Sequence, residues 1–303
     1  MDSGRSGASI ERLILRTIEV ESDAAALLRR AARSARRPRR SVLALGKASV
    51  SMANEAIRVW GDSIEAGLVV TLEDPEPGVD WPRNFQTVRG SHPEPTLASA
   101  RAGTRVSAFV ERADPRTILT VLLSGGASAQ VVSLRGGLLP KHAAAIFRRI
   151  SRAGGTIEEL NTVRRHIDSL KGGGLAERFD GSIESYILSD VVGDPLHTIG
   201  SGPTAPDPTT LDDALAVLRK RRLLTAVPET TRFLMRAVAE GGPETRKEAF
   251  GRRVRNTVIG NNAGVVRALS GALANAGIRV VASHSGLVGE AGPIGTVGAR
   301  TAL

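Results

Sequence analysis

The sequence of 303 residues contains no cysteine, very few aromatic residues and no long apolar run. The absence of cysteine excludes disulfides, zinc–thiolate sites, iron–sulfur clusters and cysteine nucleophiles. Aromatic residues make up only 3% of the chain, so aliphatic side chains and alanine must fill the core. No apolar run approaches the ~18–20 residues that a membrane span needs. Charged residues also interrupt every apolar stretch near the N-terminus, so we predict a cytoplasmic protein that has no membrane partner.

Positive charge is plentiful but unevenly placed. The formal net charge is +10, and residues 1–40 supply half of it. The segment 29–40 has seven arginines in twelve positions, yet no aromatic residue occurs before Trp60. The segment therefore lacks the stacking residues of single-strand nucleic-acid binders. We do not expect nucleic acid as a partner, and we keep a non-catalytic ligand- or nucleic-acid-binding protein as an alternative.

Apolar runs alternate with amphipathic stretches through most of the chain. Helical spacing is present in residues 8–33, 47–60, 97–112, 138–153, 157–178, 211–222 and 229–240. Continuous apolar runs typical of buried strands occupy residues 41–46, 66–71, 85–89, 117–123 and 183–188. This alternation predicts an α/β fold with a parallel sheet that is covered by helices on both faces.

The last part of the sequence repeats the pattern once more. Residues 254–260 are predicted to form a strand, 263–276 a helix and 279–283 another strand, followed by a glycine-dotted segment over 287–303. Two strands and their helices cannot bury both faces of a sheet. We therefore predict two domains, residues 1–240 and an incomplete second α/β domain over residues 241–303.

Small and charged residues follow four of the predicted strands. They are Gly46 and Lys47, the segment 90–95 with His92, the segment 124–128, and the run from Asp190 through Asp194 to Thr204. Because open α/β sheets bind ligands outside the carboxyl ends of their strands, these residues mark a candidate site.

Each of these features has a chemical interpretation and a structural alternative. Lys47 can place a positive charge against phosphate oxygens, or it is a solvated residue in a first helical turn. Segment 124–128 can form an anion-binding nest, and its glycines also suit a tight turn. Asp190 can hold Mg²⁺ or orient a hydroxyl, whereas single aspartates beside glycine often cap helices or turns.

Further cations lie in the tract 163–174, where Arg164 and Lys171 flank a glycine-rich turn or form a solvated helix face. His92 is held between serine and proline, a setting that is often only structural. The dinucleotide fingerprint, the P-loop and paired-histidine metal motifs are absent. Taken together, small-residue loops, a strand-end lysine, carboxylates and a cation cluster suit phosphoryl transfer.

These motifs together resemble the glycerate kinase family whose members carry a C-terminal MOFRL domain, often called glycerate 2-kinases. The resemblance covers about residues 8–303. It rests on ALGKAS (44–49), GSHPEP (90–95), LLSGGASA (122–129), LNTVRRHIDSLKGGGLA (160–176), LSDVVGDPLHTIGSGPTAPDPTT (188–210) and VIGNN (258–262).

The resemblance implies ATP-dependent phosphorylation of D-glycerate with Mg²⁺, with 2-phosphoglycerate the favoured product. It also implies a Rossmann-like first domain that faces a second domain across the active site. Lys47 and Asp190 would be catalytic, and Asp190 would also be the metal ligand. The expected residues that bind substrate or nucleotide are Gly46, Ser124, Gly125, Gly126, Ser128, Arg164, Lys171, Asp194, Ser201, Gly202 and Thr204.

One departure from the family concerns the end of the sequence. The family continues into a Gly-Gly-Arg-Asn-type motif in the MOFRL region, and this sequence stops at Leu303 before anything like it. We therefore expect a truncated fragment or a degenerate form with impaired activity. A hydroxypyruvate or tartronate reductase is the alternative enzyme, and the missing dinucleotide fingerprint counts against it. The oligomeric state stays open, with a homodimer as one option.

Overall fold

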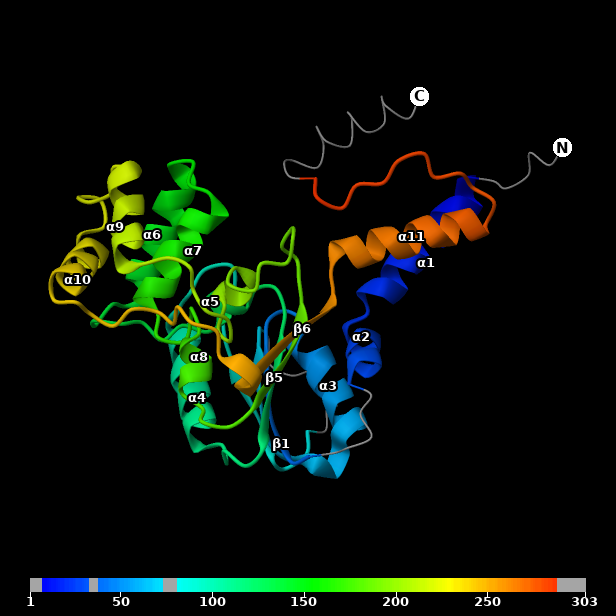
Figure 1. Cartoon of the computed structure of the whole chain (residues 1–303), viewed down its shortest axis with the longest axis horizontal. Coiled ribbons are helices and arrows are strands. Elements are labelled where there is room, and N and C mark those ends of the chain that lie inside the picture. The colour runs from blue at the N-terminus through cyan, green and yellow to red at the C-terminus, as the bar shows by residue number, and fades with distance from the viewer. Residues whose placement is uncertain (1–6, 33–37, 73–80, 288–303) are drawn as a thin grey trace.

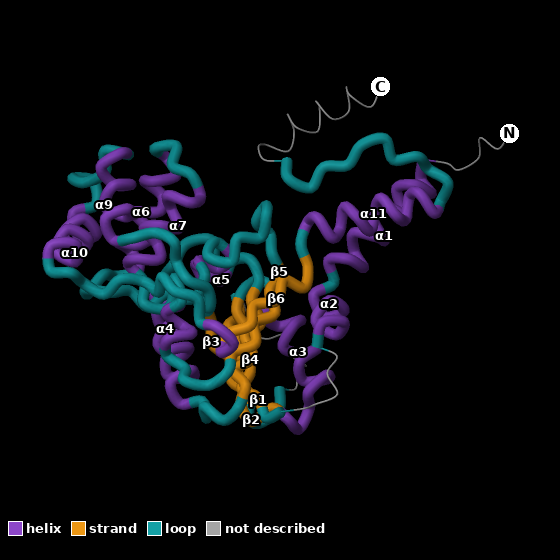
Figure 2. Tube along the Cα trace, in the orientation of Figure 1, coloured by secondary structure: helices purple, strands orange, loops and turns teal. Residues whose placement is uncertain are grey.

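A six-stranded parallel sheet forms the centre of the molecule (Figures 1 and 2). The computed structural model describes residues 7–32, 38–72 and 81–287. The strand order is β3-β2-β1-β4-β5-β6, and every neighbouring pair is parallel. This is the strand order of doubly wound dinucleotide-binding folds. The strands are β1 (Arg40–Leu45), β2 (Ile64–Thr71), β3 (Phe85–Arg89), β4 (Ile118–Leu123), β5 (Ile183–Leu188) and β6 (Val254–Gly260).

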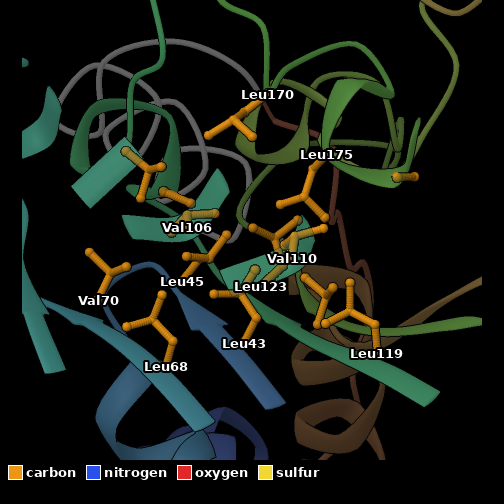
Figure 3. Packing of buried hydrophobic residues seen from close by; sticks show 14 of the residues in the cluster. Leu43, Leu45, Leu68, Val70, Val106, Val110, Leu119, Leu123, Leu170 and Leu175 are labelled. Atoms are coloured by element: carbon orange, nitrogen blue, oxygen red, sulfur yellow. The ribbon is translucent and has the colours of Figure 1, made fainter. Parts of the chain in front are cut away.

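The continuous apolar strands are buried on both faces, and successive side chains alternate between two cores. Leu43 and Leu45 of β1 point into one core, shown in Figure 3, and Val42 and Ala44 point into the other. This alternation follows from the two-residue period of a strand. A strand without polar positions therefore requires helices on both sides of the sheet.

Different helices cover the two faces. On one face, α4 (Leu97–Arg112) and α8 (Gly174–Glu177) complete the core of Figure 3. On the other face, α2 (Ala24–Ala31) and α3 (Ser49–Trp60) pack against the sheet. The predicted α/β fold, with a Rossmann-like parallel sheet and helices on both faces, is confirmed.

Four helices form a third core beside the sheet, which we call the helical lobe (Figure 1). They are α6 (Pro140–Arg152), α7 (Ile157–Ile167), α9 (Leu211–Lys220) and α10 (Pro228–Ala239). Because α6 and α7 lie between β4 and β5 in the sequence, and α9 and α10 between β5 and β6, the lobe is an elaboration of the sheet's connections. The remaining short elements lie in connecting segments. They are α5 (Ala127–Gln130), η1 (Gly61–Ser63), η2 (Ile199–Ser201) and η3 (Gly251–Arg253).

The predicted helix over residues 8–33 is two helices. The first, α1 (Gly7–Ser22), ends before Asp23, whose carboxylate accepts hydrogen bonds from the backbone N–H groups of Ala25 and Ala26 and so caps α2. Figure 1 shows α1 lying alongside α11 (Asn262–Asn275), and the two helices are in contact. Within the described residues, no helix is long and apolar enough to cross a membrane.

Two expectations about residues 241–303 are wrong. Strand β6 does not open a second sheet, because it pairs with β5 as the sixth strand of the same sheet. Residues 279–283 form no strand, and Val281 is 75% exposed. The division into domains over residues 1–240 and 241–303 stays a prediction, and residues 288–303 of the glycine-dotted segment lie outside the described residues.

The described arginines of segment 29–40 are largely engaged in ion pairs. Arg29 makes a two-pronged contact with Glu55, at 2.6 and 2.8 Å. Arg40 is buried and donates to Glu184 and Thr120, with its guanidinium over the Trp60 ring. Carboxylates thus occupy both guanidinium groups. Arg33, Arg36 and Arg37 lie outside the described residues, and the absence of a nucleic-acid partner stays a prediction.

Candidate active site

The loops that follow β1 and β4 meet at the carboxyl edge of the sheet. From β1 the chain continues to β2 and β3 on one side of the sheet, and from β4 it continues to β5 and β6 on the other side. Doubly wound folds bind ligands at such a switch point between two adjacent strands. The Lys47 N–H donates to the Gly125 carbonyl at 2.9 Å, and the Ala48 N–H donates to the Ser124 hydroxyl at 3.0 Å. The Gly46 N–H donates to the Gln130 side chain at 2.9 Å. Together these bonds hold the two loops as one unit.

The glycines of the β4 loop let three side chains approach the backbone. A Cβ atom added at Gly125 would lie 2.2 Å from Oδ2 of Asp190. Gly126 has φ +91°, and a Cβ there would lie 3.1 Å from Cγ of Lys47 and 3.2 Å from Cδ2 of His92. Lys47, His92 and Asp190 therefore converge over this turn from the ends of β1, β3 and β5.

The first of two adjoining cavities, which we call the Arg164 cavity, lies between this turn and helix α7. Its volume is about 300 Å³. It is lined by His92, Pro93, Gly125, Gly126, Ser128, Ala129, Ile157, Asn161, Arg164, Asp190, Val191, Thr198 and Gly200. The cavity thus places a carboxylate, an arginine and a histidine around a space that suits a small polar molecule.

Arg164 lines this cavity, and one of its hydrogen-bond donors is unused. Its Nη1 donates to Oδ1 of Asn161 at 2.9 Å, and its guanidinium lies 4.5 Å from the centre of the Phe147 ring. Its buried Nε has no hydrogen-bond partner among the described residues. Burial lowers the pKa of Arg164 to about 10, so the group remains charged at neutral pH. A buried charged donor of this kind calls for an anionic acceptor.

A strained turn forms another wall of the Arg164 cavity. Ser201 has φ +63°, a conformation that costs a non-glycine residue free energy. Its hydroxyl lies 2.9 Å from the Ser128 hydroxyl and donates to Oδ1 of Asn161 at 3.1 Å. Asn161 thus accepts from both Ser201 and Arg164 and connects α7 to the turn.

The charges around His92 act on its ring. Burial, followed by the positive charges of Lys47 and Arg164, lowers the pKa of His92, and the Asp190 carboxylate opposes this shift. The net result is a neutral imidazole at neutral pH. Neither ring nitrogen hydrogen-bonds to any part of the chain that the structure describes.

The second cavity, the Lys47 cavity, has a volume of about 310 Å³ and shares Gly125 and Asp190 with the first. Helices α3 and α11 both begin at its wall, so their backbone N–H groups and positive dipole ends favour an anion there. Asn261 caps α11 and also donates to the Asp194 carboxylate. The lining comprises Glu21, Ser22, Leu27, Lys47, Ala48, Ser124, Gly125, Leu188, Ser189, Asp190, Gly260, Asn261, Asn262 and Val265.

Most of the predicted site residues come together here. Lys47, Ser124, Gly125, Gly126, Ser128, Arg164 and Asp190 line one cavity or both. Gly46, Asp194 and Ser201 lie one contact behind the lining. Gly46 packs against Ser124, Asp194 accepts from Asn261, and Ser201 donates to Asn161.

Three predicted binding residues lie elsewhere. Lys171 is buried, donates to the Val131 carbonyl at 2.6 Å and pairs with Asp168 at 3.6 Å, and burial lowers the pKa of Lys171. Thr204 donates to Asn256 at 2.7 Å, and Gly202 packs against the backbone of His197. Their positions give no support to a binding role.

Sequence reasoning also missed residues that line the cavities. Asn161 stands one turn before Arg164 on α7, a spacing that places both side chains on one helix face. Asn261 directly follows β6, and this position could have been noticed had the strand been assigned to the main sheet.

The described residues contain no group of three or more His, Cys, Asp or Glu side chains that could hold a metal ion. Magnesium, however, commonly binds through one or two carboxylates together with substrate phosphates and water. Asp190 fits that pattern, since it is exposed, borders both cavities and makes no hydrogen bond within the described part of the chain.

Comparison with known proteins places the chain in a family. A model described as a domain of unknown function (DUF4147) matches residues 6–236. The chain belongs to this family. A D-glycerate 2-kinase of Thermotoga maritima is 35% identical over 205 residues, which cover 67% of this chain and 47% of the relative. A glycerate 2-kinase of Pyrococcus horikoshii is 33% identical over 251 residues, which cover 82% of this chain and 56% of the relative.

A relative named putative hydroxypyruvate reductase, from Agrobacterium vitis, is 34% identical over 264 residues, covering 86% of this chain and 58% of the relative. Among solved structures, a glycerate kinase of Thermotoga maritima matches with a TM-score of 0.78 and 30% identity, covering 89% of this chain and 62% of that one. The resemblance to glycerate kinases is confirmed, and the chain spans about half to two thirds of the length of these relatives.

Proposed function

We propose that this protein is a kinase that transfers a phosphoryl group from ATP to D-glycerate, with 2-phosphoglycerate the favoured product. One observation carries the proposal above all. Asp190 borders two cavities at once, one with an unsatisfied arginine donor and one with Lys47 and two helix N-termini. Such an arrangement suits the meeting of two anionic substrates at a single carboxylate.

The Arg164 cavity is the proposed glycerate subsite. A cavity of about 300 Å³ accommodates a three-carbon acid, and the guanidinium of Arg164, which lines the cavity, supplies a charged donor for its carboxylate. Asp190, across the same cavity, then faces a substrate hydroxyl.

The Lys47 cavity is the proposed site of the ATP phosphates. Lys47 and the N-termini of α3 and α11 provide positive charge, and the apolar side chains of Leu27, Leu188 and Val265 line its remaining wall. The proposed glycerate and phosphate subsites thus adjoin at Gly125 and Asp190, which line both cavities.

The chemical step is an in-line displacement on the γ-phosphorus. The substrate hydroxyl oxygen forms a bond to that phosphorus while its proton passes to the Asp190 carboxylate. The bond from the γ-phosphorus to the β,γ-bridging oxygen breaks, and ADP leaves with that oxygen. Lys47 stabilises the charge on the transferred group. Asp190 would also hold Mg²⁺ on the side of the Lys47 cavity, where the ion would neutralise phosphate charge.

The carboxylate subsite is tested by Arg164→Met, which keeps the stem over Phe147 and removes the charge. Loss of a charged hydrogen bond of about 1.5–3 kcal/mol predicts a KM for D-glycerate raised roughly ten- to hundredfold, with the KM for ATP unchanged. Arg149→Met, an exposed arginine of α6 outside both cavities, is the matched control. Unchanged KM values for both substrates in Arg164→Met would remove this arginine from the subsite.

The second candidate function is reduction of hydroxypyruvate or tartronate semialdehyde, and it rests on the name of the Agrobacterium vitis relative. The loop after β1 lacks the glycine fingerprint of nicotinamide dinucleotide binding. Oxidation of NADH or NADPH with hydroxypyruvate, in the absence of ATP-dependent ADP release, would favour this second function. The cytoplasmic location and a homodimer stay predictions.

A further inference from the structure

His92 is a polar side chain of the Arg164 cavity to which the proposed reaction assigns no role. It reaches the cavity from the loop after β3, separate from the strand ends that carry Lys47 and Asp190. D-glycerate has three polar groups: a carboxylate, the hydroxyl that is phosphorylated and a second hydroxyl. Arg164 and Asp190 account for the first two.

The other hydroxyl groups of this cavity, and the side-chain oxygen of Asn161, already have partners. Thr198 donates to the Glu158 carboxylate, Ser128 pairs with Ser201, and the Asn161 oxygen accepts from Ser201 and Arg164. Nδ2 of Asn161 makes no hydrogen bond among the described residues, but it can only donate. Both ring nitrogens of His92 also lack a partner there, so the histidine is the side chain of this cavity that can both donate to and accept from a substrate hydroxyl.

The charges that face His92 keep its ring neutral. Lys47 from the β1 loop and Arg164 from α7 disfavour the imidazolium, while Asp190 from the β5 loop favours it, and burial adds to the effect of the cations. A neutral imidazole has one donor and one acceptor nitrogen. A hydroxyl group can likewise donate and accept, so the two match.

We propose that His92 hydrogen-bonds the substrate hydroxyl that is not phosphorylated, and that it thereby makes the site selective for dihydroxy acids over monohydroxy acids of the same size. The inference rests on the proposed kinase function and adds a specificity-determining residue to it. His92 is exposed, so water solvates its ring when the hydroxyl is missing, and the preference for the dihydroxy acid is that of one hydrogen bond to an accessible group.

The test compares D-glycerate with D-lactate, which lacks the second hydroxyl, in an ADP-release assay. We expect His92→Phe to lower kcat/KM for D-glycerate by about tenfold and to leave that for D-lactate nearly unchanged. His92→Asn, which keeps a donor and an acceptor, should recover part of the preference. His284→Phe, an exposed histidine outside both cavities, is the control.

Binding of the two acids, measured by calorimetry on the same variants, tests the role of His92 separately from the kinase function. If D-glycerate is phosphorylated and His92→Phe leaves the glycerate-to-lactate ratio unchanged, the role of His92 is overturned and the kinase function stands. If no ADP is released but binding of D-glycerate over D-lactate depends on His92, the kinase function fails and the selectivity role stands. If D-glycerate does not bind, both fail.

Discussion

The Asp190 carboxylate lies close to the backbone of Gly125. A Cβ on residue 125 would be 2.2 Å from Oδ2 of Asp190, so the position of the carboxylate depends on the absence of a side chain. Since Asp190 is exposed and has no hydrogen bond within the described residues, it can move aside if that space is filled. The geometry of the carboxylate is thus sensitive to a single methyl group.

We predict that Gly125→Ala lowers kcat for ADP release by about ten- to hundredfold, because displacement of a catalytic group by about 1 Å has effects of that size. Its melting temperature should change little. The matched control is Gly271→Ala in α11, where nothing lies within 4 Å of the added Cβ. There kcat should stay unchanged and stability should rise by about 0.5–1 kcal/mol. Equal kcat values for the two variants would contradict the assigned place of Asp190.

Sequence reasoning found the residues whose position follows from strand ends, and it failed where side-chain direction decides. Lys47 and Asp190 directly follow β1 and β5, so parallel pairing alone brings them to one edge. Lys171 and Arg164 both looked like free cations in one glycine-rich tract. Only the packed structure shows that the Lys171 ammonium group binds the Val131 carbonyl and Asp168, whereas Arg164 lines the cavity.

Helix α7 carries the substrate-facing residues Asn161 and Arg164, and its first turn is strongly held. Thr156 and Glu159 form a reciprocal capping box at its N-terminus. Glu159 also binds Lys220 and Arg221 at the end of α9, at 2.8 and 2.5 Å. Burial alone would raise the pKa of Glu159, but the hydrogen bonds from Lys220, Thr156 and Arg221 outweigh it and lower the pKa to about 2.

This pKa predicts how stability varies with pH. Because the carboxyl pKa is depressed on folding, the stabilisation from Glu159 is complete above its ordinary pKa of 4.5 and is lost as pH falls towards 2. Glu159→Gln should therefore cost about 1 kcal/mol at pH 7, with a smaller difference from the wild type near pH 3. Denaturant unfolding at both pH values measures this. Glu229→Gln in the first turn of α10 is the control, and a pH-independent cost for Glu159→Gln would contradict the ion-pair account.

Sequence periodicity predicted where most helices and strands lie, but it did not predict which strands pair with one another. The strand over residues 254–260 was found with the bounds it has in the structure, yet its pairing with β5 depends on an open sheet edge that no local pattern reveals. The predicted helix over residues 157–178 is instead α7 and α8 with a turn between them. Asp168, whose backbone is extended, ends α7, and Gly173 with its positive φ is the residue from which α8 begins.

In the whole molecule, the doubly wound sheet supplies one wall of the site and the helical lobe the other. The sheet contributes Lys47, Asp190 and the β4 loop, and α7 contributes Arg164 and Asn161. Each cavity alone suits only one anion. In the proposed reaction, the phosphoryl group passes from the nucleotide to the glycerate hydroxyl across their shared border at Gly125 and Asp190.

The most direct test of this account is a coupled ADP-release assay with D-glycerate and ATP, run on the protein expressed from its own full reading frame. We predict ADP release that depends on D-glycerate and falls by orders of magnitude in Asp190→Asn, whose folding and melting temperature should be those of the wild type. Release of ADP at a near-normal kcat by Asp190→Asn, or none from the wild-type protein with D-glycerate, would contradict the account.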